Sequence, residues 1–219
     1  MTGEPVGLLF DMDGLLIDSE GLWTIAESEL MVVLGGEWDA SIKPLLIGKH
    51  VDQTASVFLE LSGSAESPQF VIEFLLRRVA ELFHAELPLM PGVAVLLDEL
   101  GRRGVPMAIV SASPRVLVQA ALDDIGADRF VTTVAGDEVS AAKPDPEAYL
   151  KAAAALGIDP QRCIVLEDSP TGVRAGQAAG CVVIGVPSVA PIPAGPRTFA
   201  LDSLEGIDVD WLLALPDQV

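Results

Sequence analysis

The chain has 219 residues, half of them apolar, and a formal net charge of −19 from 13 basic and 32 acidic side chains. This length and composition predict a globular protein with one sizeable core, or a core that carries a small insert. Nucleic acids and anionic membranes need clustered lysine and arginine, so the charge argues against both as partners. An anionic substrate would meet a repulsive overall field, so phosphate chemistry would need a local cation or a few well-placed basic side chains.

The chain begins without the basic region and cleavage pattern of a secretory signal, and no apolar stretch approaches the roughly 20 residues that span a membrane. Cys163 and Cys181 each open a β-rich run, where a cysteine typically packs as a small buried hydrophobe rather than in a disulfide. We therefore expect a cytoplasmic protein. A monomer is expected too, because no long apolar stripe marks a subunit interface.

Short apolar runs typical of buried strands recur along the chain, at residues 6–10, 106–110, 130–134, 163–166 and 181–186. Stretches with helical periodicity separate several of them, and glycine ends two of these stretches. Buried strands that alternate with helices indicate the α/β class. We predict a Rossmann-like parallel sheet with helices on both faces.

The interval from about residue 19 to residue 88 breaks this alternation, because it contains helical periodicity alone. Helices are expected at residues 22–34, 51–61 and 69–87, with glycine-containing breaks between them. The interval is therefore predicted to be a small all-helical domain, residues 19–88, inserted into a core formed by residues 1–18 and 89–219. Residues 187–196 are rich in proline and alanine and are expected to form a surface connection.

Two carboxylates follow the first strand in the segment Asp11-Met12-Asp13-Gly14. Residues i and i+2 of an extended segment point to one side, so both side chains can reach one point at the carboxyl edge of the sheet. Open α/β sheets bind ligands at that edge, where an ionised aspartate can displace a phosphoryl group if a cation neutralises the charges that meet. Taken alone, the same segment is more often a turn than a site.

A serine and a lysine follow at later points of the chain. Ser111 ends the second strand run, just before a helix whose N-terminal N–H groups can bind phosphoryl oxygens. Taken alone it is more often a helix cap. Lys143, one of four lysines, lies in a proline-rich loop before another helix, where a solvated lysine is the ordinary alternative.

A second acidic pair, Glu167-Asp168, ends the fourth strand run. Hard oxygen ligands of this kind suit Mg²⁺, which keeps several waters in near-octahedral geometry. Several carboxylates that met at one site would raise each other's pKa, so a cation would be needed there to keep them ionised.

Acidic pair, serine, lysine and acidic pair, in this order and each at the predicted end of a different strand, resemble the motif set of the haloacid dehalogenase-like superfamily over essentially the whole chain. The resemblance implies a magnesium-dependent phosphohydrolase with Asp11 as nucleophile and metal ligand, and Asp13 as general acid/base and further metal ligand. It also implies that Ser111, Ala112 and Lys143 bind the phosphoryl group, and that Lys143 holds Asp11 ionised. Glu167 and Asp168 would complete the Mg²⁺ site.

Within that superfamily Asp13 favours a phosphate-ester hydrolase or a phosphomutase, because members of other classes lack this second carboxylate. The helical insert resembles the cap of the β-phosphoglucomutase-like subgroup, in which cap and core close over the substrate. The mutase's residues for a second phosphate are replaced here by Trp23, Val51 and the pair Pro114-Arg115. The first motif and the segments around the later motifs resemble those of bacterial hexitol and 2-deoxyglucose 6-phosphate phosphatases more than those of the mutase.

The sequence therefore predicts a phosphatase for a small phosphorylated sugar or sugar alcohol, acting through an aspartyl-phosphate. A β-phosphoglucomutase-like mutase is the alternative, and a non-catalytic binding protein on the same fold is a third reading. Candidate substrate contacts outside the four motifs are Glu20, Trp23, Lys49, His50 and Arg115. Trp23 is equally consistent with the core of the cap, and Arg115 with solvent contact.

Overall fold

The computed structural model describes residues 5–46, 51–188 and 190–219. Contacts between Cα atoms divide the chain into two compact units, residues 1–18 with 88–219, and residues 19–87. The first unit contains a parallel sheet in the order β3-β2-β1-β4-β5-β6. Its strands are β1 Gly7–Phe10, β2 Met107–Val110, β3 Thr132–Val134, β4 Cys163–Glu167, β5 Val182–Gly185 and β6 Thr198–Ala200.

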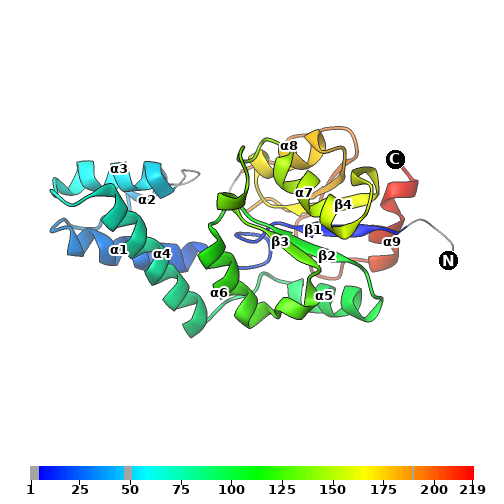
Figure 1. Cartoon of the computed structure of the whole chain (residues 1–219), viewed down its shortest axis with the longest axis horizontal. Coiled ribbons are helices and arrows are strands. Elements are labelled where there is room, and N and C mark those ends of the chain that lie inside the picture. The colour runs from blue at the N-terminus through cyan, green and yellow to red at the C-terminus, as the bar shows by residue number, and fades with distance from the viewer. Residues whose placement is uncertain (1–4, 47–50, 189) are drawn as a thin grey trace. The chain divides into compact units, whose positions relative to one another are not determined.

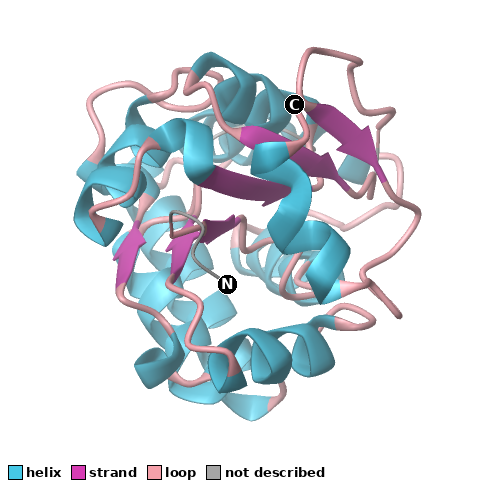
Figure 2. Cartoon of the chain, turned by 90° about the vertical axis from the view of Figure 1, so that its right-hand side faces the viewer, coloured by secondary structure: helices cyan, strands magenta, loops and turns pink. Residues whose placement is uncertain are grey.

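Helices cover both faces of this sheet. Helices α7 (Glu147–Leu156) and α8 (Pro170–Ala178) lie on one face, and α5 (Val93–Arg102) and α6 (Arg115–Ile125) on the other (Figure 1). Figure 2 shows the strands flanked by helices in a second view. The short helix α9 (Val209–Ala214) follows β6. All residues of β1, β2, β4 and β5 are buried, and apart from Glu167 at the end of β4 they are apolar or glycine, as expected for strands covered on both faces.

The second unit is helical. It consists of α1 (Glu20–Val33), α2 (Lys43–Leu46), α3 (Val51–Ser62) and α4 (Pro68–Ala85). Helix α4 buries one residue per turn, at Val71, Leu75, Val79 and Phe83, and packs against both α1 and α3. Trp38 stacks on Phe58 in the same unit, with ring centroids 6.4 Å apart.

The two chain segments that lead to and from the helical unit pair with each other inside the first unit. The Asp18 N–H donates to the Pro88 carbonyl at 2.8 Å, and the Met90 N–H donates to the Leu16 carbonyl at 3.0 Å. Ile17 and Leu89 form an antiparallel bridge between them. The outgoing and returning segments are therefore fixed side by side where they leave the core.

The predicted fold class, a Rossmann-like parallel sheet with an inserted helical domain, is confirmed. Strand β6 and the single turn α2 were not predicted from the sequence. Cys163 and Cys181 are free and buried, and burial raises the pKa of each thiol to about 12. Among the described helices, none has the length and apolar character needed to cross a bilayer.

Candidate active site

The strand order places the first and fourth motifs next to each other. Strand β1 lies between β2 and β4, and the strand order reverses there: the chain runs from β1 to β2 and β3 on one side and then crosses over to β4 on the other. Open α/β sheets bind ligands at the carboxyl ends of the strands at such a reversal. Asp11 continues β1 directly, and its N–H donates to the Leu166 carbonyl of β4 at 3.0 Å. The two acidic pairs therefore meet at one edge of the sheet.

Lys143 joins three parts of the core through one buried ammonium group. Its Nζ donates to Asp11 Oδ1 at 2.6 Å, to Glu167 Oε1 at 2.6 Å and to the Val110 carbonyl at 2.9 Å. Only 7% of the Lys143 side chain is exposed, and 9% of that of Asp11. An ammonium group has three N–H donors, so these contacts use all of them. The structure thus places Lys143 where it stabilises ionised Asp11.

The balance of charge in this cluster is negative. Burial, and then the charge of Glu167, raise the pKa of Asp11 well above its ordinary value, while Lys143 acts in the opposite direction. Burial alone would lower the pKa of Lys143, but the charges of Asp11 and Glu167 outweigh it and raise that pKa. Burial also raises the pKa of Asp168 to about 6. One ammonium therefore does not neutralise the carboxylates gathered here.

The cluster has the chemistry of a cation site. Carboxylate oxygens of Asp11, Glu167 and Asp168 lie within 4.8 Å of one another, and all three residues are buried. Buried hard oxygen donors with unbalanced negative charge fit a small divalent cation. Of the three carboxylates, that of Glu167 accepts the most hydrogen bonds from other protein groups.

Four donors from the protein surround the Glu167 carboxylate. Oε1 accepts hydrogen bonds from Lys143 Nζ and, at 2.8 Å, from the Tyr149 hydroxyl. Oε2 accepts from the N–H of Ser169 at 3.1 Å and from its hydroxyl at 3.0 Å. A carboxylate offers about four lone-pair sites, so those of Glu167 are largely taken. The predicted direct contact of Glu167 with a metal stays a prediction.

Gly14 and Ser188 lie against Asp168. A Cβ atom on Gly14 would stand 2.2 Å from Asp168 Oδ2, and Gly14 has a φ of +81°. Both facts explain the glycine in the first motif. The Ser188 hydroxyl, from the segment after β5, donates to the same Asp168 oxygen at 2.5 Å.

Asp13 belongs to a second hydrogen-bonded group, with the serines that follow β2. The Ser113 hydroxyl donates to Asp13 Oδ2 at 2.8 Å, and the Ser111 hydroxyl lies 3.4 Å from the same oxygen. Ser111 Oγ also accepts the N–H of Ser113 at 2.9 Å. The exposed Ala112 lies between them, and its carbonyl oxygen would be 2.0 Å from a Cβ on Gly136. The structure thus brings the serine motif to Asp13.

The remaining candidate residues lie elsewhere or have other partners. Arg115 binds Glu138 and Thr133, with Nε 2.8 Å from Glu138 Oε1 and Nη1 2.6 Å from Thr133 Oγ1. This network joins the start of α6 to β3, and a substrate contact of Arg115 stays a prediction. Glu20 and the half-buried Trp23 lie on α1 of the helical unit. The candidates Lys49 and His50 lie outside the described residues.

Four residues of the site were not predicted from the sequence: Tyr149, Ser113, Ser169 and Ser188. Ser113 had a usable signal, since it stands two residues after Ser111 in the same motif. No sequence signal marked Tyr149 or Ser188. Their carboxylate partners, Glu167 and Asp168, are distant in sequence and meet them only in the folded structure.

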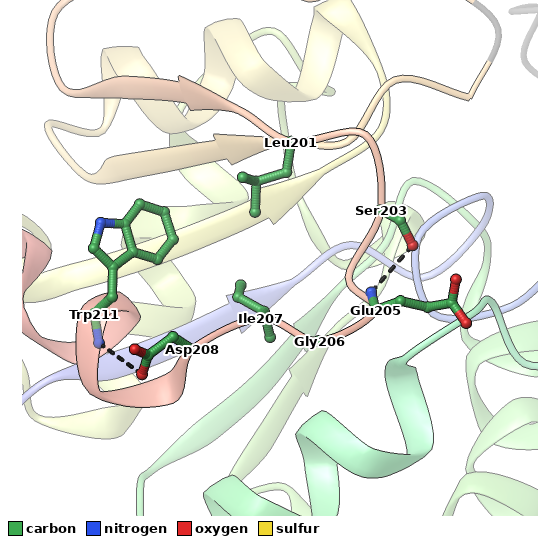
Figure 3. Close-up of a pocket in the computed structure, with 7 residues that line it drawn as sticks. All are labelled: Leu201, Ser203, Glu205, Gly206, Ile207, Asp208 and Trp211. Atoms are coloured by element: carbon green, nitrogen blue, oxygen red, sulfur yellow. Dashed lines mark hydrogen bonds between the residues drawn. The ribbon is translucent and has the colours of Figure 1, made fainter.

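A surface hollow of about 450 Å³ lies in the segment between β6 and α9 (Figure 3). Its lining residues are Leu201, Ser203, Glu205, Gly206, Ile207, Asp208 and Trp211. Asp208 caps α9, and the ring of Trp211 packs edge-on against Phe199 with centroids 6.1 Å apart. None of these residues belongs to the four motifs.

The fold and the cluster at the end of β1 define a Rossmann-like α/β enzyme built on paired carboxylates and a buried lysine. Comparison with known proteins agrees with this description. A sequence model of the haloacid dehalogenase-like hydrolase family matches residues 8–186. The chain belongs to this family.

Individual relatives align with most of the chain. Hexitol phosphatase B of Escherichia coli (strain K12) is 34% identical over 183 residues, which are 82% of each protein. Hexitol phosphatase A of the same strain is 32% identical over 216 residues, 93% of each. The crystal structure of CbbY from Rhodobacter sphaeroides in complex with phosphate superposes with a TM-score of 0.81 at 28% identity, covering 93% of this chain and 96% of that one. The predicted enzyme class, a phosphoric monoester hydrolase, is confirmed.

Proposed function

We propose that this chain is a Mg²⁺-dependent phosphatase for a small phosphorylated sugar or sugar alcohol, and that Asp11 carries the phosphoryl group during turnover. The observation that supports it best is the buried contact of Lys143 Nζ with Asp11 Oδ1 at 2.6 Å, in a cluster of carboxylates. The hexitol phosphatases that resemble the chain over most of its length support the substrate class.

Asp11 and Asp168 would hold the cation, with the backbone carbonyl of Asp13. Bound there, Mg²⁺ supplies the positive charge that lets a carboxylate approach a phosphate dianion. Lys143 keeps Asp11 ionised in a buried place where desolvation favours the neutral acid.

In the first step a carboxylate oxygen of Asp11 attacks phosphorus, and the bond between phosphorus and the ester oxygen breaks. Asp13 donates its proton to the leaving oxygen. Asp13 then takes a proton from water, whose oxygen attacks phosphorus and breaks the bond to Asp11. Inorganic phosphate leaves, and Asp11 returns to its carboxylate form. The hydroxyl of Ser113 orients Asp13 between these steps.

Residues 19–88 serve as a cap in this proposal, and closure over the core would exclude bulk water from the aspartyl-phosphate. The boundaries of this cap, the monomeric state and the cytoplasmic location stay predictions from the sequence. Absence of nucleic acid and membrane partners is likewise expected from the charge.

The test is hydrolysis of a panel of phosphate esters, with and without Mg²⁺, by the protein and its variants. Asp11→Asn should lower kcat at least about 1,000-fold, because it removes the nucleophile. Asp13→Asn should lower it about 100-fold or more through loss of the general acid. Asp124→Asn neutralises an exposed aspartate of α6 and is the matched control, with kcat expected within about twofold of the parent.

Mg²⁺-dependent turnover by Asp11→Asn at the parent rate would refute the mechanism. Interconversion of hexose 1- and 6-phosphates with a bisphosphate activator would indicate a mutase instead. A protein that hydrolyses no ester of the panel would be a binding protein on this fold.

A further inference from the structure

Tyr149 is the single tyrosine of the chain, and its side chain is completely buried. It lies on α7, six residues after Lys143, in the core between α7 and the sheet. A buried phenol hydroxyl needs a hydrogen-bond partner. Here it donates to Glu167 Oε1 at 2.8 Å, the same oxygen that accepts from Lys143.

The ring of Tyr149 contacts the other member of the same ion pair. Lys143 Nζ lies 4.9 Å from the ring centroid, over its face, which is the geometry of a cation–π interaction. One side chain thus touches the carboxylate of Glu167 with its hydroxyl and the ammonium of Lys143 with its ring. Burial, and then the charge of Glu167, raise the pKa of Tyr149 well above its ordinary value, so the hydroxyl remains a donor.

Two carboxylates, Asp11 and Glu167, compete for the single ammonium of Lys143, and both contacts measure 2.6 Å. A carboxylate oxygen that shares its charge with a second donor attracts the ammonium less strongly. Without the Tyr149 hydroxyl, Glu167 would hold Lys143 more tightly, at the expense of Asp11. The position of Lys143 against the nucleophile therefore depends on a residue that touches neither Asp11 nor substrate.

We propose that Tyr149 is a positioning residue for the hydrolytic reaction, which holds Lys143 against Asp11 through Glu167. The proposal rests on the proposed function, because it presupposes that Asp11 is the nucleophile. Its effect belongs to the chemical step, since Lys143 must stabilise ionised Asp11 when attack begins. Substrate affinity is left unchanged, because Tyr149 is fully buried and its hydroxyl is occupied by Glu167.

The hydroxyl is tested with Tyr149→Phe, which keeps the ring over Lys143. With p-nitrophenyl phosphate and Mg²⁺, kcat should fall about tenfold while KM stays within about twofold, the size expected for a residue that orients a site group. Leu156→Val is the matched control, because it loosens the packing of the same helix without contacting Glu167. Its kcat should remain within about twofold of the parent, even where its melting temperature falls as far as that of Tyr149→Phe.

A double-mutant cycle separates positioning from packing. In a Glu167→Gln background the side chain at 167 no longer competes by charge for Lys143, so adding Tyr149→Phe should change kcat less than about threefold. An equal, tenfold loss in both backgrounds would overturn the proposal, as would a kcat for Tyr149→Phe equal to that of the parent.

Where Glu167→Gln shows no measurable turnover, the comparison with Leu156→Val decides alone. Equal kcat losses at equal losses of melting temperature would then make Tyr149 a packing residue. These outcomes are distinct from failure of the proposed function, which would appear as a parent protein that hydrolyses no phosphate ester.

Discussion

At the scale of single residues, Gly172 shows how closely the backbone of α8 approaches the site. A Cβ atom there would lie 1.7 Å from Glu167 Oε1 and 1.9 Å from its Cδ. The φ of Gly172 is outside the left-handed region, so the obstacle to a side chain is this close contact alone. Gly172→Ala must therefore displace the Glu167 carboxylate. We expect kcat to fall about 10- to 100-fold, because the displaced carboxylate would disturb the oxygen cluster that it forms with Asp11 and Asp168, and the free energy of unfolding to fall by about 1–3 kcal/mol.

Steady-state kinetics and urea unfolding check this expectation. Gly101→Ala is the control, because Gly101 also lies inside a helix but a Cβ there meets nothing within 4 Å. That variant should keep its kcat and gain about 0.5–1 kcal/mol of stability. Full activity in Gly172→Ala would show that the Glu167 carboxylate does not need its place against α8.

The motif residues were predictable for a physical reason. Asp11 and Ser111 each follow a buried strand and Glu167 is the last residue of one. The carboxyl ends of parallel strands meet at one edge, so the sequence places these residues together. The resemblance of the motifs to a known family also implied that Lys143 would hold Asp11 ionised. It gave no indication of Tyr149 or Ser188, whose hydroxyls find carboxylates 18 and 20 residues away in sequence.

At the scale of elements, α1 and α2 are joined by an ion pair in a largely buried setting. Lys43 Nζ lies 2.7 Å from Glu27 Oε2 and 3.0 Å from Glu20 Oε1. The Glu27 side chain is 5% exposed, and burial raises its pKa above the ordinary 4.5, with Lys43 acting in the opposite direction. Loss of Lys43 would leave a buried carboxylate without its cation.

Lys43→Met should therefore lower the free energy of unfolding of the helical unit by about 2–4 kcal/mol at neutral pH. A carboxyl group with a raised folded-state pKa binds its proton more tightly in the folded chain. Its destabilising effect therefore disappears as pH falls through that pKa toward 4.5. The loss of unfolding free energy caused by Lys43→Met should therefore be smaller at pH 5 than at pH 7.5. Urea unfolding in a Trp211→Phe background reads this unit, because Trp23 and Trp38 then supply the fluorescence.

The charge explanation has its own control in the double variant Lys43→Met, Glu27→Leu, which removes both charges and should recover most of the lost stability. A loss of equal size at both pH values would point instead to packing of the lysine stem.

Elements were predictable where they are long or strongly apolar. The helices α1, α3 and α4 and the five strands from β1 to β5 follow from periodicity and burial. Strand β6 has three residues, none of them buried, and exists because it pairs with β5. Helix α2 is a single turn, too short for any periodic pattern. Both depend on tertiary contacts that the local sequence does not specify.

At the scale of the whole molecule, the net charge of −19 opposes the chemistry proposed at the site. Lys143 balances one carboxylate of the cluster, and a bound divalent cation would balance two more. The site itself would then be close to neutral, while the rest of the protein repels a phosphate dianion over the distance of a Debye length. Added salt shortens that distance from about 20 Å near 20 mM to about 7 Å near 200 mM.

We therefore expect kcat/KM for a dianionic ester to rise about threefold between about 20 and 200 mM tetramethylammonium chloride at constant free Mg²⁺, with kcat unchanged. Stopped or continuous phosphate-release assays across this range of salt concentration measure kcat/KM and kcat. A triple variant, Glu37→Gln, Glu66→Gln and Asp124→Asn, removes three exposed negative charges and should raise kcat/KM at low salt while flattening the salt dependence. A kcat/KM that falls with salt would mean that local cations, rather than the acidic surface, dominate the approach of substrate.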